Sequence, residues 1–187
     1  GRKGLRMSYR VHIVDNLADL DTAAWDTITA GQPFRSLRWL RFADQIIKNF
    51  RPICLILFNG ECAIGVASFA LSNDPGVTIA SAVGRRMITA MLEHYPLLLC
   101  QTPIANTPGL VLPPGDEIAA IKAMDAAIRA YAPHHHISFV IFGWLLPAQQ
   151  TMFKSIGTYN VVALDSGMTL PLQWATFDDY HKSLSRT

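Results

Sequence analysis

Apolar and polar residues along this chain follow two spacings, one typical of strands and one typical of helices. Residues 9–14 alternate between the two classes, whereas residues 52–58 and 61–71 are nearly continuous apolar runs on either side of Asn59-Gly60. An Asn-Gly pair between two such runs is a strong hairpin signal. Apolar residues on both faces of a strand indicate that both sides of its sheet are covered. The sequence therefore predicts a first strand followed by a central hairpin.

The hairpin also bears on the cysteines. In a two-residue turn Phe58 would face Glu61, and Cys54 would then face Gly65 and not Cys62. The chain has three cysteines, so one stays unpaired in any arrangement, and none belongs to a C-x-x-C motif. We therefore expect reduced, buried thiols and a cytoplasmic location.

Helical spacing occurs in five further segments. The predicted helices span residues 20–29, 37–50, 87–94, 117–131 and 147–156. Ser36 and Asp116 precede the second and the fourth of them as N-cap residues. The further predicted strands span residues 77–83, 97–100, 109–112, 137–144, 159–164 and 168–172. The apolar run at 137–144 is expected to lie buried between helices.

The last residues open one more helix. Thr176 and Asp179 form a capping-box-like start, and Phe177, Tyr180 and Leu184 then share one apolar face. Such a face needs a partner surface, because a helix this short is marginal on its own. We expect the helix to dock on its own domain, on a second domain or on a neighbouring copy.

These patterns divide the chain into three parts. Residues 1–6 have neither periodicity nor a signal-peptide core, and we interpret them as leader or expression-derived residues. Residues 7–172 are long enough for one domain with a substantial core. Residues 173–187 are interpreted as the start of a linker helix toward a second domain.

Composition narrows the class of protein. Half of the 187 residues are hydrophobic (50%) and only 16% are charged, which excludes a disordered chain. No apolar run reaches the roughly 18 residues that a membrane-spanning helix needs, so no membrane span is predicted. The net charge is +2, and without Arg2, Lys3 and Arg6 it becomes 2 − 3 = −1. No basic patch for nucleic acid is indicated.

The order of the elements is that of a mixed α/β (α+β) domain, and three stretches add a resemblance. They read P-F-R-S-L-R-W-L at 33–40, L-L-L-C-Q-T-P-I-A-N-T-P-G-L at 97–110 and T-F-D-D-Y-H-K-S-L-S-R at 176–186. These stretches resemble the N-terminal half of Fem-type acyltransferases, which carry two GNAT-like (acyl-CoA N-acyltransferase) domains in tandem. The resemblance implies a GNAT-like central mixed, largely antiparallel sheet with helices on both faces.

The cofactor turn of that superfamily is altered here. GNAT domains hold the pyrophosphate of acyl-CoA with backbone amides of a glycine-rich turn that leads into a helix. The corresponding turn, residues 112–117, has two prolines that lack N–H donors, one glycine and the carboxylates of Asp116 and Glu117. We expect Asp116 to cap the helix and to repel a phosphate. No cofactor is therefore expected in this chain, and the resemblance implies acyl-CoA or aminoacyl-tRNA in a second domain.

Five residues are weak candidates for binding substrate, and no catalytic residue can be identified. Arg38 and Arg41 lie on a basic helix face that either attracts an anionic acceptor or is simply solvated. Arg85 and Arg86 follow Gly84 in what is either an anion-binding turn or an ordinary surface loop. Gln101 follows the predicted strand 97–100, where a polar group can face a cleft.

Two further sets of residues are interpreted as structural. Cys100 has no partnered base nearby in the sequence, and its thiol is interpreted as buried and unreactive. The run His134-His135-His136 cannot point three ligands the same way and has no second ligand pair, so no metal site is expected.

Two functions remain open. In the first, the chain is the half without cofactor of an N-acyltransferase that moves an acyl or aminoacyl group to an amine, either a small molecule or a cell-wall precursor. In the second, it is a non-catalytic module with a GNAT-like fold that binds a small molecule or a partner. Either way the expected protein partner is a second GNAT-like domain or another copy, through the C-terminal helix. A standalone acetyltransferase ranks last, since CoA would have to bind despite Pro113, Pro114 and Asp116.

Overall fold

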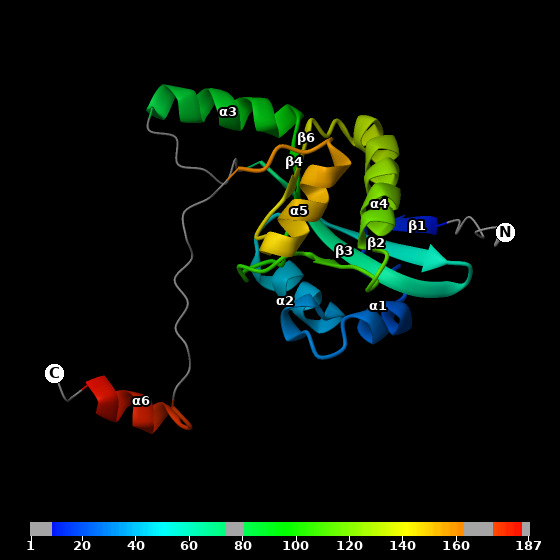
Figure 1. Ribbon diagram of the computed structural model, residues 1–187. Coiled ribbons are helices and arrows are strands. Elements are labelled where there is room, and N and C mark those ends of the chain that lie inside the picture. Colours follow the sequence, from blue (N-terminus) through cyan, green and yellow to red (C-terminus); the bar gives the residue numbers. More distant parts are fainter. Residues whose placement is uncertain (1–8, 74–80, 163–173, 185–187) are drawn as a thin grey trace.

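The computed structural model describes residues 9–73, 81–162 and 174–184, which contain one mixed sheet (Figure 1). Its strands are β1 (Tyr9–Val14), β2 (Pro52–Asn59), β3 (Cys62–Ser72), β4 (Leu97–Cys100), β5 (Leu110–Val111) and β6 (Phe139–Phe142). The order is β1-β2-β3-β4-β6, and β5 pairs with β3. All neighbours are antiparallel except β4 and β6, which are parallel. The expected mixed, largely antiparallel sheet is confirmed.

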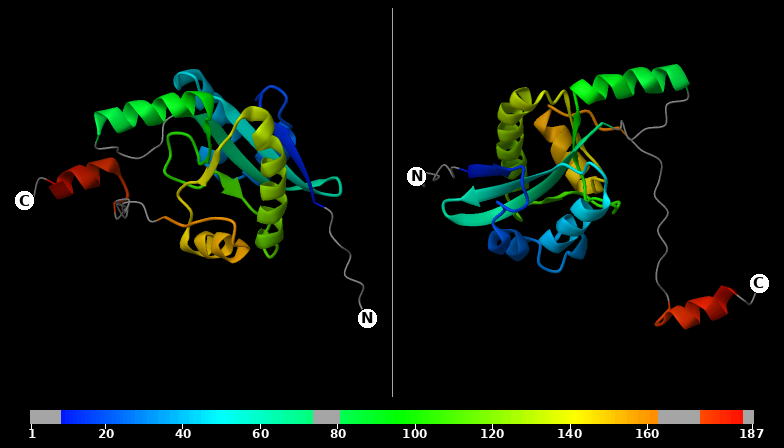
Figure 2. Two further views of the ribbon diagram at one scale, coloured as in Figure 1. Left: turned by 90° about the horizontal axis from the view of Figure 1, so that it is seen from above. Right: turned by 180° about the vertical axis from the view of Figure 1, so that it is seen from behind.

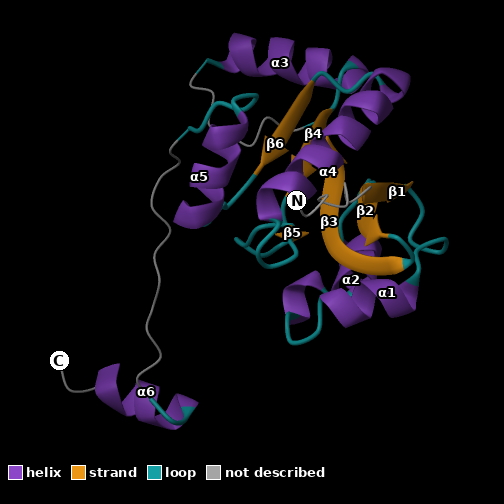
Figure 3. Ribbon diagram, turned by 45° about the vertical axis from the view of Figure 1, so that its right-hand side comes forward, coloured by secondary structure: helices purple, strands orange, loops and turns teal. Residues whose placement is uncertain are grey.

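Helices cover both faces of this sheet (Figure 3). The α-helices are α1 (Thr22–Ile28), α2 (Leu37–Ile46), α3 (Ala82–His94), α4 (Glu117–Tyr131), α5 (Pro147–Ile156) and α6 (Phe177–Leu184), with short 3₁₀ turns η1 (Pro33–Arg35) and η2 (Ala132–His135). On one face α1 and α2 bury Trp25 and Leu40 against Cys54 and Ile56 of β2. On the other face α4 and α5 pack against the alternate residues of the same strand. This two-sided burial explains why β2 is apolar throughout.

The central hairpin is confirmed, but its register differs from the predicted one. Asn59 pairs with Cys62, so Gly60 and Glu61 form the turn, and an irregularity follows between Leu57 and Phe58. Gly60 has a φ of 62°, a left-handed conformation that glycine adopts without strain. Asn59 remains in the strand because the residue that the turn requires in this conformation is the glycine.

The cysteines are only partly as expected. Cys54 faces Ser68 and not Gly65, and it is not a cross-strand partner of Cys62. All three cysteines are free, and Cys54 and Cys100 are buried. Cys62, however, is exposed, because it stands directly after the turn of the hairpin.

The predicted burial of residues 137–144 between helices is wrong. The strand β6 is shorter than this range and forms the edge of the sheet within the described residues. Its side chains alternate, with Val140 and Phe142 packed toward α5, whereas Phe139 and Ile141 are 54% and 39% exposed. The layer of α1 and α2 packs on β2 and β3 and does not cover this edge, so an apolar run here has one open face.

The segment 81–95 also differs from its prediction. Residues 82 and 83 begin the helix α3, so the predicted strand 77–83 is wrong there, and its residues 77–80 lie outside the described part. Ser81 caps the helix by accepting a hydrogen bond from the Gly84 amide at 3.3 Å. The helix has one fully buried residue, Leu92, and runs along the top of the domain in Figure 1.

The last helix, α6, lies apart from the rest of the described chain in every view (Figures 1 and 2). Thr176 and Asp179 form the predicted capping contact, with the Asp179 amide donating to Thr176 Oγ1 at 3.2 Å and that hydroxyl donating to the carboxylate at 2.8 Å. The side chains of Phe177, Tyr180 and Leu184 lie outside the described part, so the predicted docking of the helix stays a prediction.

The ends of other elements differ by a few residues from the predicted ones. The helix α2 ends at Ile46 and not at residue 50, because its C-cap residue Ile47 takes an extended conformation with a φ of −90° and a ψ of 114°. Residues 159–162 are not a strand, and the rest of the predicted strands 159–164 and 168–172 lies outside the described residues. In the described part of the chain, no helix has the length and apolarity needed to cross a membrane.

Candidate functional site

The carboxyl ends of the parallel strands β4 and β6 lie side by side, and this is the edge where open α/β sheets usually bind ligands. Cys100 ends β4 and pairs with Phe142, which ends β6. One more hydrogen bond continues the ladder, from the Gly143 amide to the Cys100 carbonyl at 2.9 Å. The predicted site residue Gln101 is the next residue after β4, so its expected position at a strand end is correct.

The loop that follows β4 is closed on itself. Residues 101–109 leave the path along β3 and return to it as β5, and an isolated bridge joins Gln101 to Pro108. Inside the loop the Thr102 hydroxyl contacts three oxygens, the carbonyls of Ala105 and Thr107 at 2.9 and 3.0 Å and the Thr107 hydroxyl at 2.5 Å. The hydroxyl groups of Thr102 and Thr107 therefore already have partners within the loop.

Glycines allow the close contacts at this edge. A Cβ on Gly109 would lie 2.6 Å from the Ser68 carbonyl oxygen and 2.7 Å from the Gln101 amide, which are backbone atoms that cannot move aside cheaply. A Cβ on Gly143 would lie 2.9 Å from the side-chain oxygen of Gln101. Gln101 thus occupies space that any larger residue at 143 would need.

The segment from Arg35 to Trp39, at the end of η1 and the start of α2, contacts the loop 101–109 at two places. Arg35 Nε donates to the Pro108 carbonyl and Trp39 Nε1 donates to the Pro103 carbonyl, each at 2.8 Å. Arg35 also donates to the side chain of Gln32. The sequence alone does not identify Arg35 as a site residue, and only its place in the stretch 33–40 points to it. In the structure, residues 35–39 anchor the loop 101–109.

The thiol at this edge is chemically inert. Burial raises the pKa of Cys100 well above its ordinary value, and nearby Arg35 and the Gly109 amide only partly oppose this effect. Burial likewise lowers the pKa of Arg35, with Cys100 acting in the opposite direction. A neutral, fully buried thiol is not a nucleophile, which agrees with the structural interpretation of Cys100.

Two bulky residues beside the strand ends have strained backbones. Ile104 and Trp144 have φ values of 65° and 57°, the left-handed region that β-branched and large side chains rarely adopt. Ile104 is 58% exposed at the tip of the loop. Strain of this kind persists only where surrounding contacts fix the backbone, and for Ile104 these are the loop contacts described above.

The turn at residues 112–117, which the sequence suggests as the counterpart of a pyrophosphate-binding turn, precedes α4. The nearby backbone amides of Glu117 and Gly115 lower the pKa of the Glu117 carboxyl group. Asp116 Oδ2 is buried and has no hydrogen-bond partner among the described residues. Two carboxylates where an anion would bind do not suit a pyrophosphate.

The expectation for Asp116 needs a correction. It stands at the N-cap position of α4, but its side chain makes no capping hydrogen bond. Its backbone φ of −138° and ψ of 26° depart from the extended conformation of a typical N-cap, and its amide closes the turn by donating to the Pro113 carbonyl at 3.3 Å. The expected cap of α4 by the Asp116 side chain is therefore absent.

The arginines predicted to bind substrate are not brought together with Gln101. Arg38 and Arg41 are exposed on α2, where they line a surface cleft of about 390 Å³ with Asp26, Phe42 and other residues. Arg85 and Arg86 are exposed in the first turns of α3, so neither the anion-binding turn nor the surface loop that the sequence left open is present, and their role in binding substrate stays a prediction. Sequence distance alone could not show that these groups belong to different faces.

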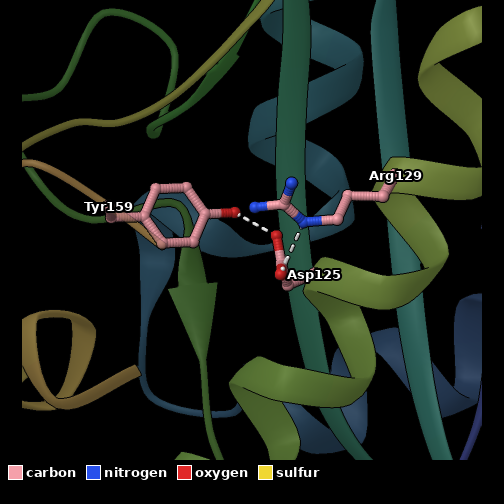
Figure 4. Close-up of polar contacts among 3 residues, drawn as sticks. All are labelled: Asp125, Arg129 and Tyr159. Atoms are coloured by element: carbon pink, nitrogen blue, oxygen red, sulfur yellow. Dashed lines mark hydrogen bonds and ion pairs between the residues drawn. The ribbon is translucent and has the colours of Figure 1, made fainter. Parts of the chain in front are cut away.

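A polar cluster joins α4 to the segment after α5 (Figure 4). Asp125 is only 9% exposed and accepts hydrogen bonds from Tyr159 Oη at 2.5 Å and from Arg129 Nε at 2.9 Å. Burial, followed by the contact with Asp125, raises the pKa of Tyr159 far above its ordinary value. All three polar groups satisfy one another, which indicates a structural staple between two elements.

The histidine run stands in the turn η2 after α4. His135 stacks on Tyr131 with ring centroids 3.8 Å apart, whereas His136 has a left-handed φ of 55°. No group of three or more His, Cys, Asp or Glu residues that could hold a metal ion occurs in the described part of the chain.

Comparisons with known proteins support the fold and no more than the fold. No family model matches the chain, and no curated protein matches it. The solved structure of aminoglycoside N-acetyltransferase AAC(6')-Iy in complex with CoA matches with a TM-score of 0.54 and 12% sequence identity, over 87% of this chain and 95% of that chain. The same enzyme in complex with a CoA-containing bisubstrate analog matches with a TM-score of 0.50 and 13% identity, over 86% and 99%. The chain thus has the GNAT fold of acetyltransferases.

Proposed function

We propose that this chain is the half of an N-acyltransferase that does not hold the acyl cofactor. The complete enzyme would move an acyl or aminoacyl group to an amine, which is a small molecule or a cell-wall precursor. A second GNAT-like domain would hold acyl-CoA or aminoacyl-tRNA and would contact this one through the C-terminal helix.

One observation carries the proposal, and it is the condition of the turn at residues 112–117. The fold is that of acetyltransferases, but the turn has one glycine and two carboxylates, those of Asp116 and Glu117. Pro113 and Pro114 provide no N–H donors. A bound pyrophosphate would have to approach the orphaned oxygen of Asp116 and the negative charge of Glu117.

The chemistry expected of such a half is positional. Amine attack on an ester or thioester carbonyl is accelerated by orienting the two reactants and by donors at the developing oxyanion. The edge of β4 and β6 contributes no free thiolate, since Cys100 is buried and neutral. This chain would therefore supply a rigid wall for the acceptor and no reacting group of its own.

Calorimetric titration with CoA tests the proposal directly. We expect no micromolar binding by the chain, and at least about tenfold tighter binding by a variant that combines Pro114→Gly, Asp116→Asn and Glu117→Gln. Glu61→Gln, which removes an exposed carboxylate of the hairpin turn, is the matched control and should change nothing. Micromolar binding of CoA by the unchanged chain would overturn the proposal.

The open reading frame offers a second test. The stretch 176–186 resembles a part of the tandem enzymes, so the proposal requires a further domain of about this length, with a glycine-rich turn before a helix. A reading frame without such a domain would leave the non-catalytic module as the better function. The buried, neutral thiol of Cys100 favours that second candidate, which would bind a ligand without transferring a group.

A further inference from the structure

A surface cleft of about 540 Å³ lies at the end of the sheet opposite to the edge described above. It is lined by the residues after β1, those that begin β2 and Leu71 near the end of β3. Because Ser72 of β3 pairs with Leu97, the first residue of β4, this end of the sheet holds the amino end of β4. The cleft therefore shares no residue with the loop 101–109 or with the turn 112–117.

The cleft has an apolar floor and walls from both helical layers. Leu17 and Ile53 are 8% and 2% exposed and belong to the core beneath it. Arg41 and Asp44 reach it from α2, whereas the stacked rings of Tyr131 and His135 form part of the opposite wall. A volume of this size lies within the range of about 300–1,000 Å³ that is usual for small-molecule sites.

Charges of both signs line the cleft without neutralising one another. Asp15 and Asp44 provide two carboxylates, and Arg41 and Arg51 provide two guanidinium groups. Within residues 9–73, 81–162 and 174–184, none of these four side chains takes part in an ion pair or a hydrogen bond. Opposite charges in one concave site that do not pair with each other are available to a ligand.

A negative and a positive side chain of the cleft both affect the hydroxyl group of Tyr131. Burial raises the pKa of its hydroxyl group, Asp15 adds to this effect, and Arg51 opposes it. A carboxylate and a guanidinium group thus both lie within electrostatic range of the same phenol, beside the stacked ring of His135.

We propose that this cleft binds a zwitterionic small molecule of the amino acid or short peptide type. Its ammonium group would lie toward Asp15 and Asp44, and its carboxylate would lie toward Arg41 and Arg51. The charges of the four side chains sum to zero, so a ligand with one group of each sign is matched. Inorganic phosphate would meet two carboxylates here, and a polyamine would meet two guanidinium groups, so neither is favoured.

This binding site is independent of the proposed function. The cleft and the cofactor turn share no residue, and the titration with CoA does not report on the cleft. Loss of either proposal leaves the other standing.

An NMR titration of the ¹⁵N-labelled chain tests the inference. The probe is alanylalanine, compared with its N-acetylated form, which lacks the ammonium group, with its C-terminal amide, which lacks the carboxylate, and with inorganic phosphate. We expect saturable shifts of the amides of residues 16–18 and 51 with alanylalanine, and binding at least about tenfold weaker for each blocked peptide and for phosphate.

Variants complete the test. Asp15→Asn and Arg51→Gln should each weaken the binding of alanylalanine at least about tenfold. Lys122→Gln is the matched control, because Lys122 is an exposed cation of α4 outside this cleft. The dispersion of the amide spectrum shows whether each variant is folded. The inference fails if no saturable shift occurs, if the blocked peptides or phosphate bind as well as alanylalanine, or if the folded Asp15 and Arg51 variants bind it unchanged.

Discussion

The two ends of the sheet differ in how their polar groups are used. At the carboxyl ends of β4 and β6, Thr102, Arg35 and Trp39 spend their donors on backbone carbonyls of a single loop. At the other end, Asp15 and Arg51 line a cleft and make no such contact among the described residues. The end that usually binds ligands in this kind of sheet is built for rigidity, and the capacity to bind charge lies at the opposite end.

The sharpest way to break this contrast is to open the closed end. Gly109→Ala should lower the free energy of unfolding by about 3 kcal/mol, because the new Cβ meets two backbone atoms that cannot both move. Urea denaturation measures the loss. Gly60→Ala is the control, with open space around it, and should cost about 1 kcal/mol through its left-handed backbone alone. Equal losses would show that the loop is not tightly held.

A smaller effect is expected when the neck of the loop loses its hydroxyl group. Thr102→Val leaves the carbonyls of Ala105 and Thr107 without this donor and should cost about 2 kcal/mol in urea denaturation. Thr27→Val removes an exposed helical hydroxyl and should change stability by less than about 0.5 kcal/mol. A loss at Thr102 no larger than the control would mean that the loop closes without it.

The hydrogen bond between Tyr159 and Asp125 should contribute about 1 kcal/mol to the free energy of unfolding, and this contribution should depend on pH. Tyr159→Phe removes the bond. The folded state raises the pKa of Tyr159, so the difference between the two proteins should be constant below pH of about 10, the ordinary value of a tyrosine, and should shrink as the pH rises above it. Chemical denaturation between pH 7 and 11 measures this. A difference that grows with pH would contradict the assigned contact.

The smallest expected effect is a titration. The backbone amides of Glu117 and Gly115 lower the pKa of Glu117, so its carboxyl group should titrate below the model-compound value of 4.5 in an NMR titration. The stabilisation from these contacts is present above pH 4.5 and is lost as the pH falls through the folded-state value. A midpoint at or above the model-compound value would contradict the effect of the backbone amides on Glu117.

Local signals predicted many of the elements but few of their neighbours. The hairpin at Asn59-Gly60, the cap at Ser36 and the helix that Gly157 ends depend on residues close in sequence, and all three are present. The sequence predicts burial of residues 137–144, because an apolar run has the same pattern in a central strand and in an edge strand. Only the order of the strands shows that β6 stands at the edge.

The candidate site was less predictable for the same reason. Gln101 could be placed at a strand end from the sequence, but Arg35 could not be linked to Pro108, which lies 73 residues away. The charges of the cleft come from the residue after β1, from α2 and from the residue before β2, and no motif connects them.

The sequence by itself determined most of the strands and helices, that the hairpin is buried on both faces, and that the turn before α4 is poor in donors for a phosphate. These properties follow from the spacing and chemistry of adjacent residues. The tertiary structure alone decided that β6 is an edge strand, that Arg35 and Trp39 anchor the loop 101–109, and that four unpaired charges share one cleft. Such contacts depend on where distant segments pack, and that packing is set by the whole core and not by any local pattern.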